Sequence, residues 1–179
     1  FITVPVNRTQ LKTIIFDLIK KNNIPQSGVR ITATGGYAPD GYTPAEGNII
    51  LQQQSLIPVT KETAATGVRI ITYEYTRDLP AVKSINYLMG VWLQKLVKEK
   101  KADDVLYFNN DRITEFPRAN IFIVNQQGKL LTPGNQVLAG ITRKKILEFA
   151  PAILPAATAD ISVKDLKNAA EVFMTSTTN

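Results

Sequence analysis

The sequence contains neither cysteine nor histidine in its 179 residues. The lack of cysteine excludes disulfide bonds and thiol nucleophiles, and the lack of histidine excludes catalysis by an imidazole base. Together the two absences remove the nitrogen and sulfur ligands of most zinc sites, so we expect no metal. An enzyme built from this chain must use lysine, carboxylate or hydroxyl groups, or borrow a cofactor.

Long apolar runs are also missing, because no stretch approaches the roughly 20 residues that a membrane-spanning helix needs. No signal peptide is visible, and we therefore expect a cytoplasmic protein without membrane contact. The chain starts at Phe1 without a methionine and stops at Asn179, directly after a predicted strand. These ends indicate an internal piece of a longer protein.

The net charge of +6 raises the question of nucleic-acid binding. The densest basic run, residues 95–101, is broken by Leu96, Val97 and Glu99. It falls at the end of a predicted helix, where cations favour the helix dipole without any ligand. We expect a solvated helix end and no nucleic-acid partner, while phosphate-bearing cofactors and acidic substrates suit the same charge.

Hydrophobic periodicity predicts helices over residues 9–22 and 142–150. A further long helix is predicted after Lys83, with an apolar stripe of Ile85, Leu88, Met89, Trp92 and Leu96. Strands are predicted over residues 28–34, 48–54, 67–75, 105–108, 121–124, 129–131 and 171–174. Hairpin-joined strands mixed with few helices are typical of an α+β fold rather than a doubly wound sheet.

Two ionisable residues are candidates for catalysis. Lys83 comes just before the predicted long helix, and both burial and the helix dipole would disfavour an ammonium ion there. A neutral amine is a good nucleophile. Glu115 follows a short strand, and a carboxylate there could keep a pyridine nitrogen protonated. The alternatives are a surface lysine and a solvated turn glutamate.

Two further segments could hold an anion. Gly140 to Thr142 opens a helix, so the backbone N–H groups of Ile141 and Thr142 would point at a ligand, unless Thr142 simply caps the helix. The hydroxyl cluster of residues 175–178 follows the last predicted strand. It offers further donors, and the alternative is a polar loop.

The order and spacing of these motifs resemble those of the fold type IV pyridoxal phosphate enzymes. This class holds branched-chain aminotransferases, D-amino acid aminotransferases and aminodeoxychorismate lyases. The resemblance is strong over residues 67–179 and looser over residues 1–55. It rests on Lys83-Ser84-Ile85-Asn86, Ile113-Thr114-Glu115, Asn120-Ile121-Phe122, Leu131-Thr132-Pro133, Gly140-Ile141-Thr142-Arg143 and the segment Phe173 to Thr178.

The resemblance implies a homodimer of two-domain subunits with pyridoxal 5'-phosphate between the domains. Residues 1–57 would be the C-terminal part of a small α/β domain, and residues 58–179 a larger mixed α/β pseudo-barrel domain without its C-terminal end. An arginine that the family also uses for the phosphate would lie upstream of Phe1. The implied cofactor residues are Lys83 for the Schiff base, Glu115 for the pyridine nitrogen, Leu138 against the ring, and Ile141, Thr142, Ser176 and Thr177 for the phosphate.

Details of the motifs resemble the D-amino acid aminotransferases and the lyases more than the branched-chain enzymes. Asn86 stands three residues after the lysine, and the last motif ends in Ser-Thr-Thr. Two features depart from the D-amino acid enzymes: Gly35-Gly36 replaces their usual arginine and glycine, and Phe116-Pro117-Arg118 replaces small residues. We therefore hypothesise that Arg118 binds the substrate carboxylate, with Thr178 as a second substrate-binding residue. An exposed turn arginine is the alternative.

The predicted reaction is transamination between a D-amino acid, such as D-alanine or D-glutamate, and a 2-oxo acid. One lysine would act as both base and acid, consistent with the lack of histidine. A branched-chain L-amino acid aminotransferase and an aminodeoxychorismate lyase remain open as alternatives. A non-catalytic dimerisation or phosphate-ligand module is the alternative outside enzymes.

Overall fold

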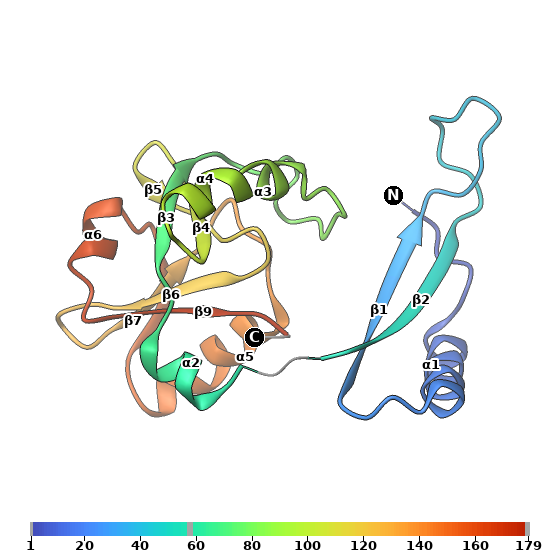
Figure 1. The fold of residues 1–179 in the computed structure, drawn as a ribbon, viewed down its shortest axis with the longest axis horizontal. Coiled ribbons are helices and arrows are strands. Elements are labelled where there is room, and N and C mark those ends of the chain that lie inside the picture. The colour runs from blue at the N-terminus through green and yellow to red at the C-terminus, as the bar shows by residue number, and fades with distance from the viewer. Residues whose placement is uncertain (1, 57–58, 178–179) are drawn as a thin grey trace. The chain divides into compact units, whose positions relative to one another are not determined.

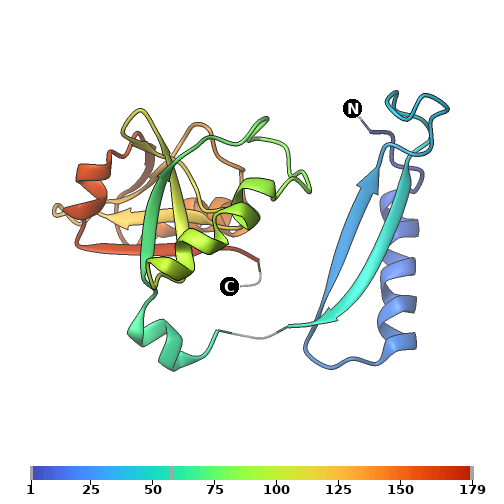
Figure 2. The ribbon, with the colours of Figure 1, turned by 45° about the horizontal axis from the view of Figure 1, so that its top comes forward.

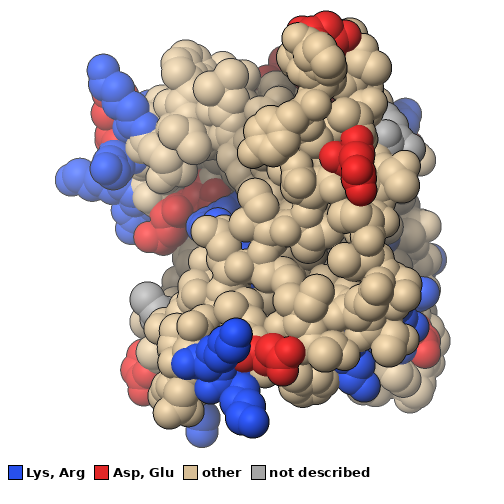
Figure 3. Space-filling view, turned by 90° about the vertical axis from the view of Figure 1, so that its right-hand side faces the viewer, with Lys and Arg blue, Asp and Glu red and all other residues tan. Residues whose placement is uncertain are grey.

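The computed structural model describes residues 2–56 and 59–177 (Figure 1). The chain divides into two compact units, Phe1–Pro58 and Val59–Asn179, called here the N-terminal and C-terminal units. Within the described residues, every helix is too short or too polar to cross a membrane. On the face shown in Figure 3, uncharged residues predominate, and groups of Lys and Arg alternate with Asp and Glu.

The N-terminal unit consists of one helix alongside one hairpin, as Figures 1 and 2 both show. Helix α1 (Arg8–Asn22) begins with a reciprocal capping box between Asn7 and Gln10, which satisfies two backbone donors at its start. Strands β1 (Ser27–Thr34) and β2 (Asn48–Ser55) pair antiparallel along their full length. The predicted helix and both predicted strands are confirmed.

The C-terminal unit contains two sheets whose strands run across each other in Figures 1 and 2. The first has the order β3-β4-β5, with β3 (Ile70–Glu74) parallel to β4 (Asp104–Asn109) and β5 (Arg112–Ile113) antiparallel. The second has the order β8-β7-β6-β9. Its strands are β6 (Asn120–Val124), β7 (Leu130–Pro133), β8 (Ala156–Ala159) and β9 (Glu171–Thr175). This mixture confirms the predicted α+β class.

Strand β6 lies at the centre of the C-terminal unit, because its two faces pack on different apolar clusters. Ile121 and Ile123 join the cluster that also takes Leu106 from β4, so this core draws on both sheets. Phe122, on the opposite face, packs with Leu130 and with the residues of α5 (Ile141–Phe149) and the 3₁₀ turn η1 (Ala150–Ala152). Each such fully buried side chain contributes about 1.5–3 kcal/mol to stability.

The predicted long helix after Lys83 is wrong in its start and in its stripe. The helical stretch begins only at Leu88 and is divided at Leu93 into α3 (Leu88–Trp92) and α4 (Gln94–Glu99). The Ser84 side chain accepts a hydrogen bond from Asn86 N, and the Asn86 side chain accepts one from Leu88 N. Such local bonds compete with helix formation and keep residues 83–87 non-helical.

The side of these helices that packs on the core is also not the predicted stripe. Leu93 and Val97 are buried against β4, with Met89 and Leu96 partly buried beside them. Ile85, Leu88 and Trp92 are exposed. The strand predicted from residue 67 starts at Ile70, and four short elements were not predicted: β8, η1, α2 (Lys61–Thr66) and α6 (Val163–Lys167).

Candidate active site

Glu115 is the centre of the candidate site and is only 4% exposed. Its backbone carbonyl accepts a hydrogen bond from Tyr107 N, which places it beside β4. Carboxylate Oε1 accepts a bond from Arg77 Nε at 2.8 Å and pairs with Arg77 Nη2 at 2.7 Å. Oε2 accepts a bond from Leu138 N at 2.9 Å. The alternative of a solvated turn glutamate is therefore wrong.

The loop that carries Leu138 is fixed against β6 by Asn120. Asn120 is buried, and its Nδ2 donates to the Leu138 carbonyl at 2.8 Å. At Gly140 a Cβ atom would collide with Asn120 Oδ1, so this close approach requires glycine. Leu138 thus reaches Glu115 through its backbone N–H and Asn120 through its carbonyl.

Helix α5 begins at this loop with Gly140 as its N-cap and, among the described residues, without a side-chain capping bond. Thr142 does not cap the helix. Its Oγ1 donates instead to the Ser176 carbonyl at 2.9 Å, which joins the start of α5 to the end of β9. The two segments predicted to bind phosphate therefore meet in space. Thr177 follows as an exposed residue, and Thr178 lies outside the described residues.

Two more buried polar residues surround this junction. Thr175 Oγ1 is buried and has no hydrogen-bond partner among the described residues. Thr175 lies directly opposite Asn120 in the β6–β9 ladder, so the two side chains share one face of the sheet. Arg143 is buried in the first turn of α5, where Nη2 donates to the Pro133 carbonyl at 2.7 Å. Burial lowers the pKa of Arg143, and the charge of Glu115 opposes that shift.

Lys83 lies in the non-helical segment before α3 and is exposed, so the expected burial at a helix start is not found. Its connection to the site is indirect and runs through Arg77. Arg77 Nη2 donates to the Pro80 carbonyl at 2.6 Å, and Nη1 donates to the Val82 carbonyl at 3.3 Å. The arginine that pairs with Glu115 thus also binds the segment leading directly into Lys83.

Arg118 does not join this group through any contact among the described residues. It is exposed, in a turn closed by the bond from Phe116 N to the Ala119 carbonyl at 2.9 Å. Burial raises the pKa of Asp104 at the start of β4, and the nearby charge of Arg118 opposes that shift. The assignment of Arg118 to the substrate carboxylate stays a prediction.

Sequence reasoning misses Arg77 and Asn120 as site residues. Arg77 stands 38 positions from Glu115, and no periodicity links the two. The motif around Asn120 suggests a strand and gives no sign that the amide would bind the Leu138 carbonyl. Both contacts arise from tertiary structure alone.

The chemistry of this donor and acceptor set fits pyridoxal phosphate. A carboxylate can accept roughly four hydrogen bonds, and among the described residues Glu115 accepts one at Oε1, where Arg77 Nη2 also forms an ion pair, and one at Oε2. One acceptor position therefore remains on Oε2 for a protonated ring nitrogen. The uncapped N–H groups at the start of α5, a helix of nine residues, suit a phosphate group.

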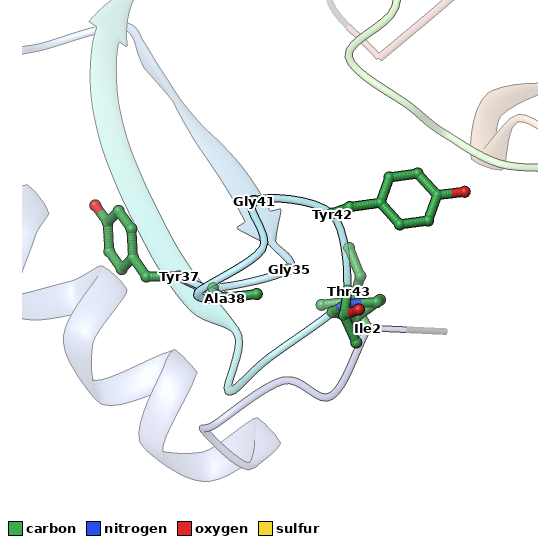
Figure 4. A pocket seen from close by; sticks show the side chains of 9 residues that line it. Ile2, Gly35, Tyr37, Ala38, Gly41, Tyr42 and Thr43 are labelled. Atoms are coloured by element: carbon green, nitrogen blue, oxygen red, sulfur yellow. The ribbon is translucent and has the colours of Figure 1, made fainter.

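Two hollows of the molecule lie elsewhere. One, of about 540 Å³, belongs to the N-terminal unit and is lined by Ile2 and the loop between β1 and β2. Figure 4 shows the rings of Tyr37 and Tyr42 pointing away from each other along this loop. The second, of about 420 Å³, is lined by Arg112, Asp160 and several amide side chains. Neither hollow includes Glu115 or the start of α5, and the described residues hold no cluster of carboxylates suited to a metal ion.

Comparison with known proteins identifies the family. The sequence profile of amino-transferase class IV matches residues 1–179. The chain belongs to the class IV aminotransferase family. The predicted family is thereby confirmed, and class IV aminotransferases depend on pyridoxal phosphate.

The relatives of this class IV chain carry several activities. It is 29% identical to a D-alanine aminotransferase of Listeria monocytogenes serotype 4b (strain F2365), covering 99% of this chain and 64% of that protein. It is 25% identical to the crystal structure of a putative 4-amino-4-deoxychorismate lyase from Legionella pneumophila, with a TM-score of 0.87, covering 98% of this chain and 67% of that one. The chain thus spans less than two thirds of the length of the curated relative.

A second similar structure confirms the fold. The branched-chain aminotransferase from the archaeon Thermoproteus uzoniensis, with norvaline, is 21% identical, with a TM-score of 0.84, covering 99% of this chain and 63% of that one. The fold type IV architecture expected from the sequence is therefore confirmed.

Proposed function

We propose that the protein is a pyridoxal phosphate-dependent transaminase that moves an amino group between a D-amino acid and a 2-oxo acid. The observation that carries this proposal is the buried Glu115, whose Oε2 keeps one acceptor position among the described residues, beside a helix start that no described side chain caps. A ring nitrogen and a phosphate are the two groups that such an arrangement binds.

The cofactor residues have distinct roles in this proposal. Pyridoxal phosphate, when bound, supplies an aldehyde for amines and a ring that accepts the electron pair left by a departing Cα proton. Glu115 Oε2 would accept a hydrogen bond from the ring nitrogen and so would keep that nitrogen protonated. Leu138 would pack against the ring, and the N–H groups of Ile141 and Thr142 would bind the phosphate together with Ser176 and Thr177.

Lys83 provides the amine and moves the proton. Its Nζ would hold the cofactor through the aldehyde group that the cofactor supplies. When the substrate amine replaces it there, the same Nζ would take the proton from the substrate Cα and later give it back, acting first as base and then as acid. Because one amine serves both steps, the lack of histidine is no obstacle.

Three features support a D-amino acid as the substrate. Asn86 stands three residues after Lys83, and the last motif ends in Ser-Thr-Thr. The D-alanine aminotransferase of Listeria monocytogenes matches nearly the whole chain. D-Alanine and D-glutamate are the substrates we propose first, with Arg118 and Thr178 as residues that bind the substrate.

A half-reaction assay on the intact protein tests this proposal. We expect the yellow absorbance of the bound cofactor to disappear on adding D-alanine or D-glutamate, and to persist with L-leucine. Borohydride should attach the cofactor to Lys83, and Lys83→Ala should abolish both signals. A colourless protein without borohydride labelling contradicts cofactor binding, whereas a response to L-leucine alone indicates a branched-chain enzyme.

Glu115→Gln gives an independent check of the ring-nitrogen role. The loss of a charge-assisted hydrogen bond of about 1.5–3 kcal/mol should lower kcat/KM roughly 10- to 150-fold. The matched control is Glu148→Gln, because Glu148 forms an exposed ion pair with Lys145 on α5, away from Glu115. Equal kinetics of the two variants would contradict the role of Glu115.

An aminodeoxychorismate lyase is the second candidate, favoured by the similarity to the Legionella pneumophila structure. The same lysine and glutamate can serve elimination as well as transamination. Release of pyruvate from aminodeoxychorismate, without amino-group transfer from D-alanine, would identify the lyase. We further propose a cytoplasmic homodimer, with residues 1–57 in the small domain and 58–179 in the cofactor-binding domain.

A further inference from the structure

We infer that Arg77 is a positioning residue that couples the carboxylate of Glu115 to the backbone of the segment carrying Lys83. The inference rests on the proposed function, because it concerns the two groups that the cofactor needs. It assigns to Arg77 the role of fixing the positions of Glu115 and of the segment that carries Lys83, without contact to the substrate.

The contacts of Arg77 carry the first step of this inference. Its side chain is 14% exposed and that of Glu115 is 5% exposed. All three guanidinium nitrogens make contacts. Nε and Nη2 contact Glu115 Oε1. Nη2 also donates to the Pro80 carbonyl, and Nη1 donates to the Val82 carbonyl. Only the planar fork of an arginine can bind a carboxylate and two carbonyls at once, and a lysine lacks this geometry.

The second step concerns the two oxygens of Glu115. Arg77 holds Oε1 through a hydrogen bond from Nε and an ion pair with Nη2, while Oε2 accepts only the bond from Leu138 N among the described residues. Arg77 therefore reserves Oε2 as the atom that faces a ring nitrogen. Without Arg77 the carboxylate could rotate, and the bond to Leu138 N would no longer be fixed.

The third step concerns the turn before Lys83. Leu79 has φ +46°, a left-handed conformation that a leucine rarely adopts. The turn is closed by the bonds from Val82 N to the Leu79 carbonyl and from Ser84 N to the Val82 carbonyl. Because strained turns persist only when surrounding contacts determine them, the bonds from Arg77 to Pro80 and Val82 stabilise this one. The position of Lys83 thus depends on Arg77.

Hydrogen–deuterium exchange of the intact, cofactor-free protein tests the coupling. In Arg77→Met, the amides of Val82 and Ser84 and the amide of Leu138 should exchange about tenfold faster or more. Amides of β6 should stay as in the wild type. The matched control is Arg112→Met, which breaks an ion pair with Asp160 whose side chains are 65% and 51% exposed. Arg112→Met should change the exchange rates of neither the Val82 and Ser84 amides nor the Leu138 amide.

Arg77→Lys is the second variant and separates the two halves of the contact. This variant keeps a positive charge near Glu115 but lacks the planar guanidinium group. The Leu138 amide should therefore recover part of its protection from exchange. The amides of Val82 and Ser84 should still exchange faster than in the wild type. Unchanged exchange at Leu138, Val82 and Ser84 in Arg77→Met overturns the inference. Faster exchange throughout β6 as well also overturns it, because Arg77 would then be a general stabiliser.

Cofactor titration distinguishes failure of this inference from failure of the proposed function. If the wild type binds pyridoxal phosphate, Arg77→Met should weaken binding about tenfold or more and reduce borohydride labelling of Lys83. Wild-type binding with no change in the variant refutes the coupling and leaves the transaminase proposal standing. A wild type that binds no cofactor refutes the transaminase proposal and, with it, the catalytic meaning of the coupling.

Discussion

The close approach between Gly140 and Asn120 leads to a sharp prediction for Gly140→Ala. The backbone of Gly140 has φ −61° and ψ 144°, which alanine adopts without strain. The obstacle is Asn120 Oδ1, which occupies the space that the new Cβ needs. The Asn120 side chain must move, and its bond to the Leu138 carbonyl, at 2.8 Å, is then lost.

The expected magnitude follows from three contributions. A carbonyl left without its partner costs about 1–3 kcal/mol. Displacing a packed side chain costs about 1–3 kcal/mol more. Replacing glycine by alanine restricts the unfolded chain, which stabilises the folded state by about 0.4–1 kcal/mol and offsets part of the loss. We expect Gly140→Ala to lower the free energy of unfolding by about 3 kcal/mol, within a range of about 1–5 kcal/mol.

Urea unfolding followed by far-UV circular dichroism measures this change, and the Asn120→Ala background provides the control. Asn120→Ala alone should cost about 1–3 kcal/mol, because it leaves the same carbonyl without its partner. In that background the collision is absent, so adding Gly140→Ala should cost nothing further. Additive losses in the double variant, or a stable Gly140→Ala single variant, would refute the reasoning.

Three other predictions concern substrate binding and stability. Arg118→Ala should raise KM for the amino acid roughly 10- to 100-fold with kcat little changed, as measured in steady-state assays. Thr132→Val should lower the free energy of unfolding by about 2 kcal/mol in urea, because Thr132 Oγ1 donates to the Ile121 carbonyl and accepts from Arg143 Nε. Ser162→Ala should cost about 1 kcal/mol at neutral pH, because it removes the N-cap of α6.

The α6 cap also has a pH dependence with a definite sign. The bonds from the Ser162 hydroxyl and amide lower the pKa of Asp165 from its ordinary value of 3.8. The stabilisation is therefore fully present above that value and is lost as pH falls through the lowered pKa. Urea midpoints of the wild type should fall more steeply below about pH 4 than those of Ser162→Ala. Parallel pH profiles of the wild type and Ser162→Ala would contradict this prediction. An unchanged KM would contradict the prediction for Arg118→Ala, and an unchanged urea midpoint would contradict the one for Thr132→Val.

Much of the fold could be predicted because its main elements carry local signals. The capped helix α1, the hairpin from β6 to β7 and the apolar strand β9 all have the periodicity and turn residues of their class. Strand β8 has the sequence Ala-Ala-Thr-Ala, which lacks strand propensity, and forms only by parallel pairing with β7. The helix after Lys83 was misplaced because Ser84 and Asn86 bind the backbone locally.

Several residues of the site could be predicted from the sequence, but the hydrogen bonds between them could not. Motif spacing singled out Glu115, Leu138 and Thr142, and the structure joins them through the Leu138 amide and the bond from Thr142 to Ser176. The bonds of Arg77 link positions that no local pattern relates. Such partners depend on how β3, β4 and the following loops are placed in three dimensions, and a single sequence does not contain that information in readable form.

The bond between Thr142 and the Ser176 carbonyl also bears on the order in which the protein matures. It joins groups 34 positions apart, across β8 and α6. During synthesis, α5 can form early, but Thr142 at its start lacks the Ser176 carbonyl as a partner until β9 has docked beside β6. If the start of α5 holds the phosphate, as we propose, a nascent chain that ends before residue 171 should bind the cofactor poorly, and cofactor loading should follow the docking of β9.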